Sequence, residues 1–193
     1  MKPDGAHTHS RRGLSPLDVS QNRKEAKWTA GELVIRALWF ISLPLFRLSP
    51  RQLWWWRRGM LRAFGARIGE RAHVYPSVRI TIPWNLEIGA EAAVGDRAIL
   101  YALGPIRICE RATVSQYAHL CAGTHDLTKP HRPLVKAQIS IGADAWVCAD
   151  AFVGPGVTVG QQSIVGARAV VMKDVAPFTT VAGNPAREVG PAD

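Results

Sequence analysis

Aliphatic residues recur every six positions through the C-terminal two thirds of the chain. The repeat begins at Ile68, slips twice by two residues, breaks after Leu120 and resumes at Ile141. All the repeat positions are Ile, Val or Leu: Ile68, Val74, Ile80, Ile88, Val94, Leu100, Ile108, Val114, Leu120, Ile141, Val147, Val153, Val159, Val165 and Val171. An amphipathic strand has a period of about 2 and a helix about 3.6, so neither explains this spacing.

A small residue follows most of these aliphatic residues four positions later, as at Ala72, Ala92 and Ala118. Three units of six residues close one triangular coil of about 18 residues, and each coil stacks on the next. The aliphatic side chain then points into the prism and the small residue fits its corner. The pattern predicts an all-β fold, a left-handed parallel β-helix of hexapeptide repeats over residues 68–187.

The remaining segments differ in composition from the repeat. Residues 1–67 hold 13 Lys and Arg against 4 Asp and Glu, and this difference of 9 equals the net charge of the whole chain, +9. The polar, basic residues 1–30 are typical of a disordered tail. Residues 31–67 are expected to form an N-terminal helical segment, and residues 188–193 a C-terminal tail.

The apolar run over 33–48 is interrupted by Arg36 and Pro44 and is too short for a typical membrane-spanning helix. It fits a helix that packs over one end of the domain, and residues 31–67 are also a candidate for peripheral contact with a membrane. Nucleic acid is not expected as a partner, because no nucleic-acid motif accompanies the basic residues. The expected location is the cytoplasm, at the inner face of the membrane.

The long break in the repeat is the main functional clue. A regular coil needs no insertion, and a long loop in a compact domain is often functional. His125 lies where the coil ends, and a loop near 126–138 is expected to leave the prism. A histidine there suits general-base chemistry, because its ordinary pKa of about 6.5 lies near neutral pH.

Several short motifs accompany the repeat: Tyr75–Val78, Pro83–Gly89, Thr124–Asp126, Ala145–Val147, Gly154–Val157 and Val181–Ala186. Together they resemble the hexapeptide-repeat O-acetyltransferases. The branch that they resemble most is that of the colanic-acid and other exopolysaccharide biosynthesis acetyltransferases. Maltose and galactoside acetyltransferases are more distantly similar.

The resemblance implies transfer of an acetyl group from acetyl-CoA to a hydroxyl of a sugar or polysaccharide precursor, directly in a ternary complex. His125 matches the catalytic base. The acceptor-binding residues that it implies are Trp146, Asn85 and Asp126, and the CoA-contacting residues are Ala149, Ala167, Lys173 and Arg187. It further implies a homotrimer, with His125 of one chain facing Trp146 of another, and no metal.

Three alternatives stay open at this point. The first is N-acetylation of an amino sugar or antibiotic by the same base chemistry. The second is a non-catalytic β-helix binding module, which would show an uninterrupted repeat. The third is a metal enzyme that uses His119, His125 and His131. Residues six apart lie on successive faces of the prism, so one chain cannot bring these three within ligand distance of about 2.0–2.1 Å.

Overall fold

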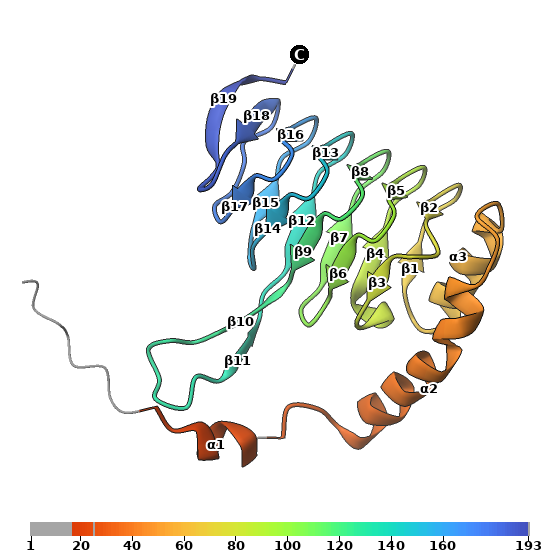
Figure 1. The fold of residues 1–193 in the computed structure, drawn as a ribbon, viewed down its shortest axis with the longest axis vertical. Coiled ribbons are helices and arrows are strands. Elements are labelled where there is room, and N and C mark those ends of the chain that lie inside the picture. Colours follow the sequence, from red (N-terminus) through yellow and green to blue (C-terminus); the bar gives the residue numbers. More distant parts are fainter. Residues whose placement is uncertain (1–16, 25, 193) are drawn as a thin grey trace, which may run out of the picture.

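The computed structural model describes residues 17–24 and 26–192. It is a three-faced prism with a hairpin that protrudes from its side and helices that cover one end (Figure 1). The first face contains β1 (Arg67–Ile68), β4 (Leu86–Ile88), β7 (Ile106–Ile108), β12 (Ile139–Ile141) and β15 (Thr158–Val159). The second contains β2 (His73–Val74), β5 (Ala93–Val94), β8 (Thr113–Val114), β13 (Trp146–Val147), β16 (Ile164–Val165), β18 (Thr179–Ala182) and β19 (Arg187–Pro191). The third contains β3 (Arg79–Ile80), β6 (Ile99–Tyr101), β9 (His119–Cys121), β14 (Phe152–Val153) and β17 (Val170–Val171).

The core of the prism consists of the repeated aliphatic side chains. All the predicted repeat positions, from Ile68 to Val171, are buried. Neighbouring coils pair in parallel, so that Leu120 lies between Leu100 and Val153. The predicted fold class, a parallel β-helix with an N-terminal helical segment and an extruded loop, is confirmed.

The coils stack too closely at their corners for a side chain at some positions. A Cβ atom added at Gly142 would lie 2.4 Å from the backbone nitrogen of Gln161 on the next coil. The small residues at the repeat corners are buried for the same reason, as at Ala118. Thr124 is exposed instead, because it lies where the chain leaves the prism.

Two helices cover the first coil. Helix α2 (Ala30–Arg47) begins with a capping box between Thr29 and Glu32, and α3 (Trp54–Ala63) follows it. The indole of Trp39 donates a hydrogen bond to the Ile80 carbonyl (3.0 Å). The buried Arg57 donates to the Val74 carbonyl (2.6 Å), so its charge-bearing group satisfies backbone oxygens at the end of the prism. None of the helices in the described ranges is long and apolar enough to span a membrane.

The protruding hairpin consists of β10 (Gly123–His125) and β11 (Leu134–Lys136), which pair antiparallel with each other. These strands form a two-stranded sheet of their own. The loop between them, 126–133, is the first part of the predicted loop near 126–138, and β11 lies in the remainder.

Both predicted tails differ from the structure where it describes them. Within residues 1–30, positions 1–16 lie outside the described residues, whereas α1 (Val19–Lys24) is helical and contacts the hairpin. Residues 188–191 belong to β19, which pairs antiparallel with β18. Composition did not reveal either element, because both are held by contacts with distant or neighbouring strands and not by an apolar pattern of their own.

Candidate active site

His125 is the last residue of β10 and lies exposed on the hairpin, opposite Leu134. Its Nδ1 is 2.7 Å from the carbonyl oxygen of Arg132. A carbonyl oxygen can only accept a hydrogen bond, so Nδ1 carries the proton. In the neutral ring, Nε2 therefore holds the lone pair and is the nitrogen that can act as a base.

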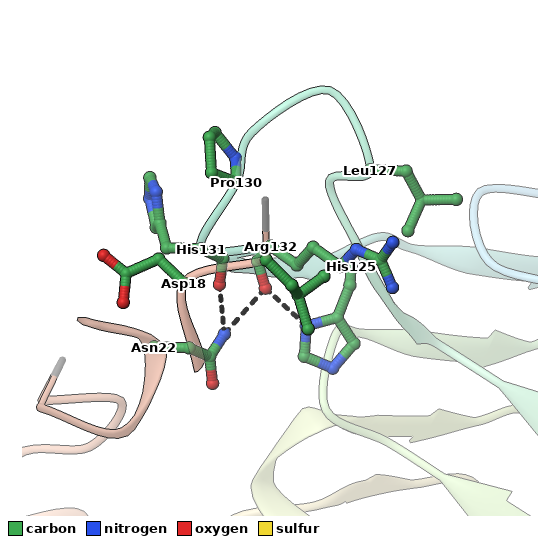
Figure 2. Close-up of a pocket in the computed structure, with 8 residues that line it drawn as sticks. Asp18, Asn22, His125, Leu127, Pro130, His131 and Arg132 are labelled. Carbon is green, nitrogen blue, oxygen red and sulfur yellow. Dashed lines mark hydrogen bonds between the residues drawn. The ribbon is translucent and has the colours of Figure 1, made fainter. Parts of the chain in front are cut away.

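The imidazole lines a cavity of about 300 Å³ between the hairpin and the N-terminal segment (Figure 2). The cavity is lined by Leu17, Asp18, Asn22, His125, Leu127, Pro130, His131 and Arg132. Five of these eight residues belong to the hairpin, and the other three lie more than a hundred positions earlier in the chain.

Asp126, the neighbour of His125, is engaged elsewhere. Its Oδ1 accepts hydrogen bonds from the Thr128 hydroxyl (2.6 Å) and the Thr128 backbone N–H (2.9 Å). These bonds hold the pKa of the Asp126 carboxyl below its usual range. The carboxylate thus closes the turn of the loop, and the partner of the imidazole Nδ1 is the Arg132 carbonyl.

The other two residues predicted on the acceptor side lie on the prism. Trp146 is exposed on β13 and its Nε1 donates to the hydroxyl oxygen of Ser115 (2.8 Å). Asn85 ends a short 3-10 helix, Pro83–Asn85, and its amide donates to the carbonyls of Ala102 (2.9 Å) and Leu103 (3.0 Å). Neither side chain lines the His125 cavity, so a single chain does not bring the predicted acceptor residues together.

The predicted CoA residues divide into two pairs. Lys173 and Arg187 line one groove of about 520 Å³ beside the last coils, together with Asp174 and Glu188. Ala149 and Ala167 lie on successive coils, where the Ala149 carbonyl accepts from the backbone N–H of the residue after Ala167 (3.0 Å). The two alanines are not among the residues that line the groove.

The three histidines spaced by six lie in different settings. His119 is half-buried on β9, where burial lowers its pKa, while His125 and His131 border the hairpin cavity. Across residues 17–24 and 26–192, no group of three His, Cys, Asp or Glu side chains is placed to hold a metal ion.

Sequence reasoning missed Asp18 and Asn22, which line the cavity beside His125. Both belong to a polar stretch with no repeat or motif. Asn22 donates to the carbonyls of His131 (2.6 Å) and Arg132 (2.8 Å), across more than a hundred residues of sequence. No local pattern in the sequence signals a contact of that kind.

Known proteins are similar to this chain over most of its length. It is 41% identical over 152 residues to a protein assigned as the colanic acid biosynthesis acetyltransferase WcaF of Escherichia coli K12, covering 79% of this chain and 84% of that one. It is 27% identical over 140 residues to the galactoside O-acetyltransferase of the same organism, covering 69% and 67%. No protein-family profile matches it.

A similar fold has been solved for a hexapeptide-repeat acetyltransferase from Vibrio cholerae in complex with acetyl-CoA. The TM-score is 0.79 at 22% identity, over 87% of this chain and 92% of that one. The predicted resemblance and the prediction of an acetyltransferase are confirmed by these relatives. On its repeat, its fold and its identity to WcaF, the chain belongs to the hexapeptide-repeat acetyltransferases, in the group of the colanic acid biosynthesis enzymes.

Proposed function

We propose that this protein transfers an acetyl group from acetyl-CoA to a hydroxyl of a sugar or polysaccharide precursor, with His125 as the general base. The observation that carries the proposal is the state of the His125 ring. Its Nδ1 is committed to the Arg132 carbonyl, so Nε2 is left as the basic nitrogen on an exposed ring beside a cavity. This ring lies on the hairpin that interrupts the repeat, where a merely structural prism would need no insertion.

In the proposed reaction, Nε2 of His125 takes the proton of the acceptor hydroxyl as its oxygen attacks the thioester carbonyl. The C–O bond forms, and the carbonyl electrons move to the oxygen of a tetrahedral intermediate. Collapse of the intermediate breaks the C–S bond, and the imidazolium returns its proton to the leaving thiolate. Neutral histidine suits both steps because it accepts and releases a proton near neutral pH.

The donor is assigned to the groove that Lys173 and Arg187 line together with Asp174 and Glu188. Lys and Arg side chains bind phosphate oxygens through charge-assisted hydrogen bonds, and CoA carries several phosphates. Ala149 and Ala167 would offer a surface without bulky side chains for the rest of the donor. The solved Vibrio cholerae relative is complexed with acetyl-CoA, which supports the choice of donor.

A homotrimer is proposed because one chain leaves the site incomplete. The His125 cavity contains neither the acceptor-side Trp146 nor the cations of the donor groove. The hairpin protrudes away from its own prism and is available to meet a neighbouring chain (Figure 1). A threefold axis is a common way to repeat such a contact until the ring closes. Trp146, Asn85 and Asp126 stay assigned to the acceptor in this proposal.

The location proposed is the cytoplasm, at the inner face of the membrane. Peripheral contact with the membrane is proposed because α2 exposes an apolar face. Its exposed side chains are Leu33, Val34, Leu38, Phe40, Ile41 and Leu45, each more than half exposed. Arg47 is the last residue of α2 and Arg51 follows it in the sequence, and both positive charges would favour anionic lipid headgroups. The test is co-sedimentation with vesicles of anionic or neutral phospholipid. The double variant Phe40→Asp with Ile41→Asp is expected to lose binding to the anionic vesicles, and a change of oligomeric state instead would identify the face as a subunit contact.

The reaction is tested by acetyl-CoA turnover on a panel of acceptors: galactosides, glucose, maltose, glucosamine and chloramphenicol. The His125→Ala variant is expected to lose about 10²–10⁴-fold in kcat on the best acceptor, the usual contribution of a general base. Its thermal stability should stay unchanged, because His125 is exposed. Full transfer by the variant would refute the mechanism. Turnover of glucosamine alone, with the acetyl group on its nitrogen, would establish N-acetylation in place of O-acetylation.

The trimeric site is tested by mixing subunits. His125→Ala and Trp146→Ala chains are each expected to be inactive alone. If a site takes His125 from one chain and Trp146 from the next, random mixed trimers should regain about a quarter of the wild-type sites. Absence of any recovery in mixed trimers, or a monomer in light scattering, would reject the intersubunit site.

A further inference from the structure

The segment before α2 is fastened to the His125 hairpin at separate points. We name residues 17–24 and 26–28 the N-terminal strap. At one end, the Asp18 backbone N–H donates to the Pro130 carbonyl (3.0 Å). At the other, Lys136 of β11 lies over the ring of Trp28, with its Nζ 4.2 Å from the ring centroid. The strap therefore follows the hairpin from its loop to its second strand (Figure 1).

Between these points, the side chain of Asn22 reaches the backbone beside His125. Its Nδ2 donates to the carbonyls of His131 (2.6 Å) and Arg132 (2.8 Å). Its Oδ1 accepts from the Nζ of Lys27 (2.9 Å). An ammonium group can only donate and carbonyls can only accept, so these three bonds fix which end of the amide faces the hairpin.

The Arg132 carbonyl is the point at which the strap and the base meet. The same oxygen accepts hydrogen bonds from the Asn22 amide and from the Nδ1–H of His125, as the dashed lines in Figure 2 show. Arg132 has a φ of 44°, in the left-handed region that a side chain disfavours. A backbone held in that conformation needs support from its surroundings, and Asn22 bonds the two carbonyls that precede and follow the Arg132 Cα atom.

We propose that Asn22 is a positioning residue for the catalytic base: it fixes the Arg132 carbonyl, which in turn selects the Nδ1–H tautomer of His125 and orients Nε2. This inference rests on the proposed function, because it concerns the base of that reaction. Asn22 itself does not touch the reacting atoms. Its contribution is to keep the carbonyl oxygen where only one tautomer and one ring orientation satisfy it.

The position of the carbonyl matters because the proposed chemistry uses one nitrogen. With the carbonyl released, either nitrogen of His125 can carry the proton and the ring can turn about its side-chain bonds. The fraction of chains with an aligned Nε2 lone pair then falls. A misplacement of about 1 Å at a reacting group costs up to about 10²-fold in rate, whereas acceptor binding does not depend on the tautomer in the same way.

The first experiment reads the tautomer without any acceptor. Full-length protein labelled with ¹⁵N-histidine is examined by NMR at a pH of about 8, above the ordinary histidine pKa. The His125 signals are assigned by their loss in His125→Gln. Wild type is expected to show one tautomer, protonated at Nδ1, while Asn22→Ala and Asn22→Asp show a mixture. Asp matches Asn in size but offers no amide donor, so it separates hydrogen bonding from packing.

The second experiment measures kcat and KM separately on the best acceptor of the panel. Both Asn22 variants are expected to lose about 10- to 100-fold in kcat with little change in KM. Gln21→Ala, on the same helix and outside the cavity lining, is the matched control and should keep wild-type kinetics. In a His125→Ala background, Asn22→Ala should have no further effect, because its only route to the chemistry has been removed.

An unchanged tautomer together with an unchanged kcat in both Asn22 variants would overturn the assignment. An equal loss in the His125→Ala background would also overturn it, since Asn22 would then act by another route. If His125→Ala retains full transfer, the proposed function fails, and the NMR result still decides whether Asn22 sets the tautomer. Circular dichroism of each variant ensures that the β-helix is intact.

Discussion

The prism is built from stacked aliphatic side chains, whereas the hairpin and the N-terminal strap are joined by hydrogen bonds and cation–π contacts. Each inward position of the prism repeats the one below it, as Leu120 repeats Leu100. In the hairpin, β10 and β11 pair with each other as a separate two-stranded sheet, and the strap donates hydrogen bonds to the hairpin carbonyls of His131 and Arg132. The prism is therefore the more rigid region, and the hairpin is the region where single polar contacts decide the geometry.

This difference separates stability from chemistry. A regular coil can bury its apolar residues but offers the same surface at every level. The interruption after Leu120 places an imidazole outside the prism, where it is exposed and is oriented by one carbonyl. Substitutions in the prism should therefore change the free energy of unfolding of the whole protein. Substitutions in the strap should change only the local stability and geometry of the hairpin.

The largest effect is expected from a truncation inside the prism. Leu120 is fully buried between neighbouring coils, so Leu120→Ala should lower the free energy of unfolding by about 2–5 kcal/mol. The matched truncation Val135→Ala, on the exposed strand β11, should change it by less than about 0.5 kcal/mol. Urea denaturation measures both. Equal losses in the two variants would mean that the hairpin is as much part of the core as the prism.

A smaller loss is expected where two coils touch through their backbones. Gly142→Ala places a Cβ atom 2.4 Å from the backbone nitrogen of Gln161 and should cost about 1–3 kcal/mol in unfolding free energy. Gly59 lies inside α3 with open space around it, so Gly59→Ala should stabilise the protein by about 1 kcal/mol. Thermal unfolding of the pair checks the opposite signs. A neutral Gly142→Ala would show that the coils can separate at little cost.

The attachment of the strap should be weaker still. The ring of Trp28 lies 4.2 Å from the charged groups of both Arg36 and Lys136, and each such contact contributes about 0.5–1 kcal/mol at an exposed site. Trp28→Ala should therefore speed hydrogen exchange in residues 123–136 by about tenfold and leave the prism unchanged. Trp55→Ala, an exposed tryptophan of α3, is the control. Faster exchange throughout the prism would show that the strap supports the whole fold.

The prism could be predicted from sequence because its packing repeats along the chain. Every aliphatic position that the six-residue spacing marked from Ile68 to Val171 is buried, and the break in that spacing located the hairpin with His125. In a parallel β-helix each coil contacts mainly its neighbours, so periodic sequence maps directly onto periodic contacts. No periodic sequence pattern marks β19, which pairs antiparallel with β18 at the end of the second face.

The surroundings of His125 were not predictable in the same way. The sequence indicated a histidine beside a long loop, but the partner of its imidazole is a backbone carbonyl. Every residue carries such a carbonyl, so the sequence does not show which one will face the imidazole. Asp126 is an example: the resemblance placed it among the acceptor-binding residues, and only the structure shows that its carboxylate bonds Thr128 within the same turn. Asn22 is a polar residue in a polar segment, and only the folded chain brings it to Arg132.

The smallest effect is expected from His119, a polar ring on the apolar surface of the prism. It packs edge-on against Tyr101 and Phe152, and in the described part of the chain its buried Nε2 has no hydrogen-bond partner. Burial lowers the pKa of His119. Below a pH of about 6.5 the unfolded chain therefore takes up a proton on His119 that the folded chain does not. The free energy of unfolding is accordingly highest above that pH and decreases as the pH falls towards the folded pKa of His119.

His119→Phe keeps an aromatic ring of similar size but cannot be protonated. The wild-type urea midpoint should fall between a pH of about 7.5 and one of about 5.5, and the fall should be shallower in the variant. A pH-dependent loss that His119→Phe removes would mean that even the prism has one site where the protonation of a single side chain affects stability. Parallel falls in both proteins would assign the pH dependence to other groups and leave the prism governed by aliphatic packing alone.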